Sequence, residues 1–444
     1  KLPLRPSLFH HMRELAVYKW LIRNKKSGDL LNLPEVQDSL QKKAAQLFVE
    51  FILATCTSHP DLYALMIVKS GNFALKHGVA EVVSIGFLGY SILEGSVLGN
   101  FAKGCELAGV GEALAEKYGN SPSSCIVYFT IGALILHWTA PAKEGLVYLQ
   151  RAAACALEAG NVLIGGYAHV VLLENKYLMG VPLEEVLAEV EKCKKFTKKV
   201  QHENLELNIA IYGRMAAKLK GEASSSTVLE ELYQAGKMDK ASQITYLFTR
   251  MQFLYLTGEY RQALAIMEEI KPLLDVVMGF LLSSDCNFYH SLVAAACYEK
   301  ATRKEQRRLG RELAKNQRQM KKWALSCPAN FSHKYLLVEA ERARLAGRRE
   351  QAEKLYDDAI ASAREGGFLQ NEALACELAG KYYAQGGRGR IARVYLTDAY
   401  RLYTAWGAAA KAQSLQEEYP DLIAADAEKA LDTAQIWRQL FFSA

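Results

Sequence analysis

Apolar residues in the C-terminal part of the chain recur with the period of an amphipathic helix. In one stretch they fall at i, i+3, i+4, i+7 and i+11, at Ala352, Leu355, Tyr356, Ala359 and Ala363. The same spacing returns 40 residues later, at Ala392, Tyr395, Leu396, Ala399 and Tyr403. Another apolar helical face precedes each stretch, so the pattern predicts two successive pairs of helices.

The two predicted pairs share much of their sequence. Residues 346–367 read AGRREQAEKLYDDAIASAREGG, and residues 386–407 read GGRGRIARVYLTDAYRLYTAWG. Gly347 at the first turn corresponds to Gly387 at the second, and glycine suits these places because helices often end on a residue with positive φ. A sequence echo at a fixed period predicts a repeat architecture of stacked helix pairs.

The spacing of Gly347, Ala352, Tyr356 and Ala359 resembles the tetratricopeptide pattern, although the period of 40 is longer than the standard repeat of about 34 residues. Further turns are expected along the chain near Gly99, Pro141, Gly180, Gly221, Gly258 and residues 301–304. No strand-like alternation of polar and apolar positions is convincing. The prediction is therefore an all-α fold, a TPR-like α-α superhelix (solenoid) of about eight to nine helix pairs.

We predict a single TPR-like helical repeat domain over residues 1–423, because no low-complexity linker divides the chain. The best repeats are residues 331–367 and 371–407. Residues 424–444 are expected to form a C-terminal helix or a linker. The chain begins at Lys1, so it is expected to be a piece of a longer protein.

Composition adds few constraints. Hydrophobic residues make up 50% of the 444 residues and charged residues 23%, as in ordinary folded domains. The net charge of +6 is too mild to imply nucleic acid on its own. Nine cysteines are scattered without a C-x-x-C motif, which indicates a reducing, cytoplasmic environment. The longest clean apolar run, residues 126–136, is too short to span a bilayer.

Motifs for chemistry are weak. GRGRIA, residues 387–392, formally matches a dinucleotide-binding fingerprint, but that motif follows a strand and here a helix precedes it. Cys286 and His290 stand at i and i+4 on a predicted helix, yet no second pair completes a metal site. His137 and Trp138 are expected to pack between helices. We predict no catalytic, cofactor-binding or metal-ligating residue, and the sequence does not identify the residues that bind a ligand or partner.

Two stretches are strongly basic, residues 192–199 (KCKKFTKK) and residues 301–323. Such clusters contact phosphates, an anionic membrane surface or an acidic protein. A solvated helix face is the simplest interpretation. Among the binding interpretations an acidic protein partner is preferred, because no aromatic residues are interleaved for base stacking.

A more specific resemblance covers roughly residues 4–423. The stretch from NFSHKYLL to the distinctive YLTDAYRLYTAWGA, together with PSLFHHMRELAVYKWLIRNKKSGDLLNLPEV near the start and HWTAPAKEGLVYLQRAAACALEAGN in the middle, resembles the helical repeat region of very large signalling kinases. In those proteins a Ser/Thr kinase-like domain precedes a STAND-type ATPase, this repeat region, a GAF domain and a histidine kinase.

The resemblance implies a non-catalytic module for protein–protein interaction and regulation within a multidomain signal-transduction kinase. Its partner would be another protein or a flanking kinase or ATPase domain, bound on a concave face made by the first helix of each pair. The chain itself is not expected to be an enzyme. One alternative is a small-molecule-sensing helical domain that uses the glycine-rich residues 84–99. A second alternative is a nucleic-acid-binding helical solenoid that uses residues 301–323.

Overall fold

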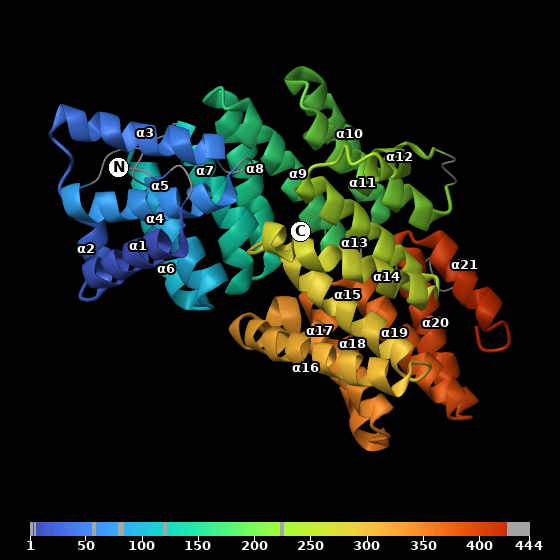
Figure 1. Cartoon of the computed structure of the whole chain (residues 1–444). Coiled ribbons are helices and arrows are strands. Elements are labelled where there is room, and N and C mark those ends of the chain that lie inside the picture. Colours follow the sequence, from blue (N-terminus) through green and yellow to red (C-terminus); the bar gives the residue numbers. More distant parts are fainter. Residues whose placement is uncertain are drawn as a thin grey trace. The chain divides into compact units, whose positions relative to one another are not determined.

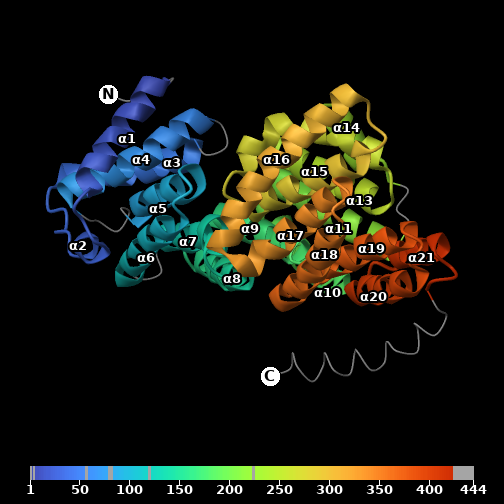
Figure 2. The same ribbon diagram turned by 90° about the horizontal axis from the view of Figure 1, so that it is seen from below.

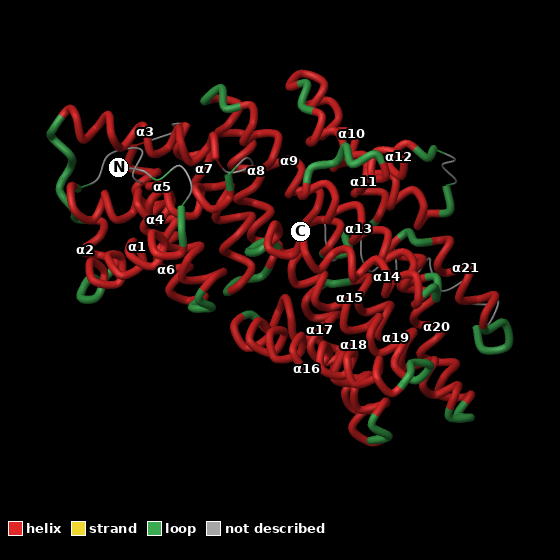
Figure 3. Tube along the Cα trace, in the orientation of Figure 1, coloured by secondary structure: helices red, strands yellow, loops and turns green. Residues whose placement is uncertain are grey.

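The computed structural model describes residues 3, 6–55, 59–78, 84–118, 122–222 and 226–423. Within these ranges the chain is predominantly helical and contains no β-strand (Figure 1, Figure 3). The all-α prediction is therefore confirmed for this part of the chain. The helix or linker predicted at residues 424–444 lies outside the described residues. None of the described helices combines the length and the hydrophobicity needed to cross a bilayer.

The helices form two compact units. Unit 1 consists of Lys1–Leu172 with Met278–Phe280, and unit 2 of Leu173–Val277 with Leu281–Ala444. The prediction of a single repeat domain over residues 1–423 stays a prediction, because a stacked helical array also divides into compact groups of neighbours.

The described residues of unit 1 form eight α-helices and part of a ninth, together with short π- and 3-10 segments. In chain order the segments are α1 (Leu8–Ile22), α2 (Ser27–Leu31), α3 (Ser39–Thr55), α4 (Pro60–His77), α5 (Ser84–Ile92), η2 (Leu93–Val97), α6 (Phe101–Tyr118), α7 (Pro122–Thr130), η3 (Ile131–Ile135), η4 (Leu136–Trp138), α8 (Ala142–Glu158) and the first part of α9 (Val162–Leu178). α1 begins directly after Ser7.

Unit 2 contains the end of α9 and the remaining helices. They are α10 (Leu183–Val200), α11 (Glu203–Lys220), α12 (Val228–Gln234), α13 (Lys240–Leu256), α14 (Tyr260–Ile270), η5 (Lys271–Val277), α15 (Leu281–Tyr298), α16 (Arg303–Ser326), α17 (Pro328–Leu345), α18 (Arg349–Gly366), α19 (Leu369–Gln385), α20 (Gly389–Trp406) and α21 (Ala409–Glu418).

Most helices of unit 2 pack against their neighbours in sequence. The two echoing segments form α18 and α20 with the turns before them. α18 packs on α17 and α20 packs on α19, and these are the most extensively packed pairs of the described chain. Gly347 and Gly387 occupy the turns with φ of 70° and 74°. The predicted pairs and their glycine turns are therefore confirmed.

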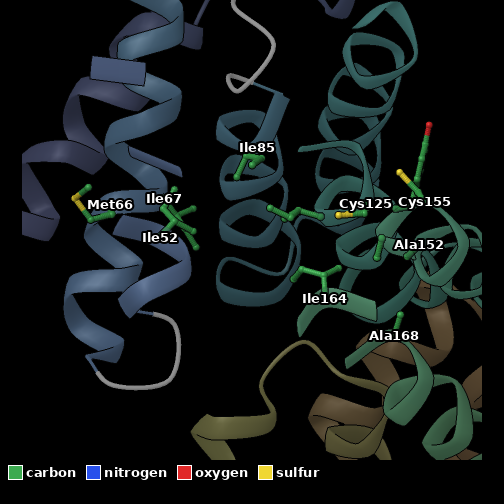
Figure 4. Close-up of a cluster of buried hydrophobic side chains, with 12 residues drawn as sticks. Ile52, Met66, Ile67, Ile85, Cys125, Ala152, Cys155, Ile164 and Ala168 are labelled. Carbon is green, nitrogen blue, oxygen red and sulfur yellow. The ribbon is translucent and has the colours of Figure 1, made fainter. Parts of the chain in front are cut away.

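Glycines in unit 1 bring α5 directly onto α4. A Cβ atom on Gly89 would lie 1.9 Å from Cγ2 of Ile67, and one on Gly86 would lie 2.8 Å from the backbone nitrogen of Gly71. Beside this contact, apolar side chains from α3, α4, α5, α7, α8 and α9 form a buried cluster (Figure 4). At these two positions glycine permits close packing of the helices, and the small-molecule-sensing alternative for residues 84–99 stays a prediction.

The inner side of unit 2 is polar and buried. Each alternate helix from α9 to α21 supplies side chains to it, namely Glu174, Tyr177, Tyr212, Gln252, Tyr255, Asp285, Tyr289, Lys334, Glu341, Glu377 and Lys411. We call this set the polar core. The side chains of this set are buried, and the concave binding face made by the first helix of each pair stays a prediction.

Hydrogen bonds and ion pairs in the polar core join different helices. Nζ of Lys334 lies 2.6 Å from Oδ2 of Asp285, and both side chains are at most 2% exposed. The hydroxyl of Tyr212 donates to Glu174, and burial raises the pKa of Glu174 to about 7 despite that bond. Pairing of this kind is required because an unpaired charge in the interior is costly.

Glu377 is the second charged centre of the polar core. It accepts from Nζ of Lys411 at 2.7 Å and from the hydroxyl of Tyr403 at 2.6 Å. Burial alone would raise its pKa, but the ammonium groups of Lys411 and Lys381 outweigh burial and hold the pKa at about 2. The last helix α21 is thereby tied to α19 and α20.

Helices from the start and from the end of unit 2 also touch, so the helices close around the polar core. α21 packs against α11 (Figure 1, Figure 2). The side-chain amide of Gln370 on α19 donates to the backbone oxygen of Leu178 at the end of α9, at 2.6 Å. Gly407, after α20, sits against Leu183, where an added Cβ would lie 3.4 Å from the leucine Cβ.

The pair of Lys334 and Asp285 gives a direct test of the polar core. Lys334→Met leaves the Asp285 carboxylate buried without its partner and is expected to lower the free energy of unfolding by about 3–5 kcal/mol. The double variant with Asp285→Asn is expected to lose less than the sum of the two single variants. Urea unfolding measures both.

The matched control is Lys322→Met, on an exposed position of α16, which is expected to change stability by less than about 0.5 kcal/mol. A Lys334→Met variant as stable as this control would contradict the account of the polar core.

Candidate interaction surface

The second predicted basic stretch forms the long helix α16. The helix begins after Thr302, whose side-chain oxygen accepts from the backbone nitrogen of Glu305 at 3.3 Å. An N-cap threonine followed three residues later by glutamate is typical of a helix start. Helix-forming residues then continue until Pro328 opens α17.

One face of α16 is apolar and buried. Leu309, Leu313, Met320 and Trp323 are all less than 9% exposed. They recur at helical spacing, so the opposite face of the helix points to solvent. α15 and α17 pack against this helix within unit 2.

Both acidic residues of α16 form ion pairs or hydrogen bonds with other helices of unit 2. Glu312 accepts from His290 on α15 at 2.9 Å and from Lys271 of η5 at 2.9 Å, and Arg308 lies 3.3 Å away. The hydrogen bond with His290 is the main reason that the pKa of Glu312 falls to about 2, and Lys271 adds to it. Glu305 pairs with Arg261 of α14 at 2.7 Å.

The solvent face of α16 carries only positive charge along its length. Six exposed residues line it, Lys304, Arg307, Arg311, Lys315, Arg318 and Lys322. We call them the basic row. At about 100° per residue they fall within an arc of about 80°, and the row is about 27 Å long. None of the six forms an ion pair with a carboxylate among the described residues.

The first basic stretch, residues 192–199, lies on α10 and is less uniform. Lys194 pairs with Glu191 at 2.8 Å, and Lys192 approaches Glu189 at 3.6 Å. Charge on this helix is therefore partly neutralised by its own acidic residues, in contrast to the basic row.

The other motifs singled out in the sequence lie in places where they serve helix packing. GRGRIA contains the turn before α20 and the start of that helix, and a helix precedes it, so the strand–turn–helix setting of a dinucleotide site is missing there. His290 is engaged by Glu312, and burial raises the pKa of the Cys286 thiol, which disfavours the thiolate that binds metal. The indole of Trp138 donates to the backbone oxygen of Leu134 at 2.9 Å.

Unit 1 exposes an apolar row that the sequence reasoning missed. Leu8, Met12 and Trp20 recur at multiples of four on α1, with Phe9 beside them, and they are 56–78% exposed. Their spacing could have been found by the same helical count. Several large apolar side chains exposed along one helix are typical of a region that contacts another protein.

No known protein-family model matches the chain. A segment of 56 residues, 13% of the chain, is 39% identical to part of the hybrid signal transduction histidine kinase G of Dictyostelium discoideum. The match spans 2% of that kinase. The similarity concerns a short part of a much larger protein.

The contacts of Glu312 predict that the stability difference between the unmodified chain and the variant Glu312→Gln depends on pH. Glu312→Gln replaces a carboxylate that contacts three partners by a neutral amide. The substitution is expected to lower the free energy of unfolding by about 2 kcal/mol at pH 7. The folded-state pKa of about 2 lies below the ordinary value of 4.5, so the stabilisation is complete above about pH 5 and is lost as pH falls toward 2. Urea unfolding at pH 7, 5 and 3 measures the difference.

Glu350→Gln, an exposed position on α18, serves as the control and is expected to stay within about 0.5 kcal/mol of the unmodified chain. A Glu312→Gln difference that stays the same from pH 7 to pH 3 would contradict this assignment.

Proposed function

We propose that this chain is a non-catalytic, cytoplasmic module for protein–protein interaction and regulation in a multidomain signal-transduction kinase or STAND ATPase. Its helix pairs belong to a TPR-like α-α superhelix of about eight to nine pairs. The partners are another protein or the kinase and ATPase domains of the same polypeptide. The chain contributes recognition, and catalysis belongs to the parent protein.

The observation that carries the proposal is the echoing pair of helix pairs, α17–α18 and α19–α20. Stacked units of this kind build extended surfaces rather than a single catalytic pocket. The similarity of a short segment to a hybrid histidine kinase supports a place in signalling. The distinctive C-terminal sequence YLTDAYRLYTAWGA supports the same family of large kinases.

Surface chemistry supports binding to proteins. The basic row of α16 and the apolar row of α1 are both exposed. The polar groups on the inner side of unit 2 are engaged with one another, so recognition in unit 2 falls to its outer helices.

The proposal is tested in the full-length parent protein. Lys334→Met, which disrupts unit 2, is expected to change the basal ATPase or kinase activity about fivefold or more, because a regulatory module is coupled to the catalytic domains. The chain on its own is expected to turn over no ATP. Activity is measured by phosphate release and by autophosphorylation.

Lys195→Met, at an exposed position of α10 outside the basic row, is the control in the same protein and is expected to leave basal activity unchanged. ATP hydrolysis by the isolated chain, or a Lys334→Met protein with unaltered basal and stimulated activity, would contradict the proposal.

A further inference from the structure

The basic row of α16 has a charge pattern that its own unit does not balance. The two glutamates of the helix face other helices of unit 2, Glu305 toward Arg261 of α14 and Glu312 toward Lys271 of η5 and His290 of α15. The guanidinium groups of Arg311 and Arg318 donate to backbone oxygens of their own helix, those of Arg307 and Ala314. Like charges three and four residues apart repel one another on a helix, so an added row of anions would relieve this repulsion.

The spacing of the row favours a helical counterpart. Its members follow one another at steps of three and four residues, so the charges repeat about every 5.4 Å along the helix axis. A second helix with carboxylates at the same steps repeats its charges with the same period. The two rows then pair along their whole length.

The C-terminal end of the basic row favours an acidic protein as the binding partner over a membrane surface or a nucleic acid. Leu325 continues the same steps beyond Lys322 and is 75% exposed. An apolar side chain there suits an apolar neighbour on a partner. Membrane binding is stronger when an apolar face accompanies the basic one, and the apolar face of α16 is buried in unit 2. Single-stranded nucleic acid would be favoured by exposed aromatic residues, and the row contains none.

We propose that the basic row binds an acidic α-helical segment of a partner protein, with carboxylates at i, i+3, i+4 and i+7 and an apolar residue that packs on Leu325. This assignment rests on the proposed function and names the class of partner. Exposed ion pairs are individually weak and are screened by salt, so the complex is electrostatic, weak and reversible.

The experiment measures binding of a labelled peptide to the full chain by fluorescence anisotropy at low salt. The probe is an Ala/Glu helical peptide of about 21 residues that carries Glu at the stated steps and ends in Leu. A shuffled peptide of the same composition spreads its Glu residues around the helix. The ordered peptide is expected to bind about tenfold more tightly than the shuffled one.

The variant Arg311→Glu/Lys315→Glu/Arg318→Glu is expected to bind the ordered peptide at least about tenfold more weakly. The matched control, Lys195→Glu/Lys198→Glu/Lys237→Glu, makes the same change of charge at exposed positions outside the row and is expected to retain binding. If charge reversal impairs folding, as judged by circular dichroism, the corresponding Gln substitutions replace it in both variants.

Leu325→Gln is expected to weaken binding of the peptide that ends in Leu and to leave unchanged the binding of a peptide that ends in Gln. Equal binding of ordered and shuffled peptides, or equal losses in the row and control variants, would overturn the assignment. Tighter binding to duplex DNA of about 20 base pairs, or to phosphatidylserine vesicles, would also overturn it. Such results would overturn the acidic-helix partner but not the regulatory role, which the activity of the full-length protein tests separately.

Discussion

The buried ion pair between Lys334 and Asp285 shows the constraint on which unit 2 depends. An ammonium group and a carboxylate leave water together, and each is tolerable in the interior only because the other is present. Glu377 with Lys411 repeats the arrangement near the last helix. Because the members of each pair come from different helices, the order in which the helices meet is fixed by charge as well as by apolar packing.

Closure of the helices around the polar core decides where recognition can occur. Their inner side is occupied by their own tyrosines, carboxylates and ammonium groups, which hydrogen-bond with one another. The outer helices of the pairs are left to face solvent. α16 shows the result most clearly, because its acidic residues turn toward unit 2 while its basic row stays outside.

Local features were predictable from the sequence. The start of α1 after Ser7, the glycine turns at Gly347 and Gly387, and the basic helix at residues 301–323 all follow from caps, glycine conformation and helical spacing. The sequence predicted that residues 301–323 form a basic helix. It did not predict that the basic row lacks acidic partners, because that depends on which helices pack beside it.

Contacts between distant residues were not predictable from one sequence. Lys334 and Asp285 are 49 residues apart, and the bond from Gln370 to Leu178 spans 192 residues. Helical periodicity says which side of each helix is buried but does not say which helix it meets. The polar core, whose contacts join helices far apart in the sequence, therefore could not be anticipated.

Lysine reactivity in the native protein tests the closed polar core most directly. Brief labelling with an acylating reagent, followed by mass spectrometry, is predicted to modify Lys304, Lys315 and Lys322 of the basic row quickly. Lys334 and Lys411 are predicted to stay unmodified until urea unfolds unit 2, because their side chains are at most 5% exposed. Labelling of Lys334 and Lys411 at the rate of the basic row, in the absence of urea, would contradict the closed inner face and the role that it leaves to the outer helices.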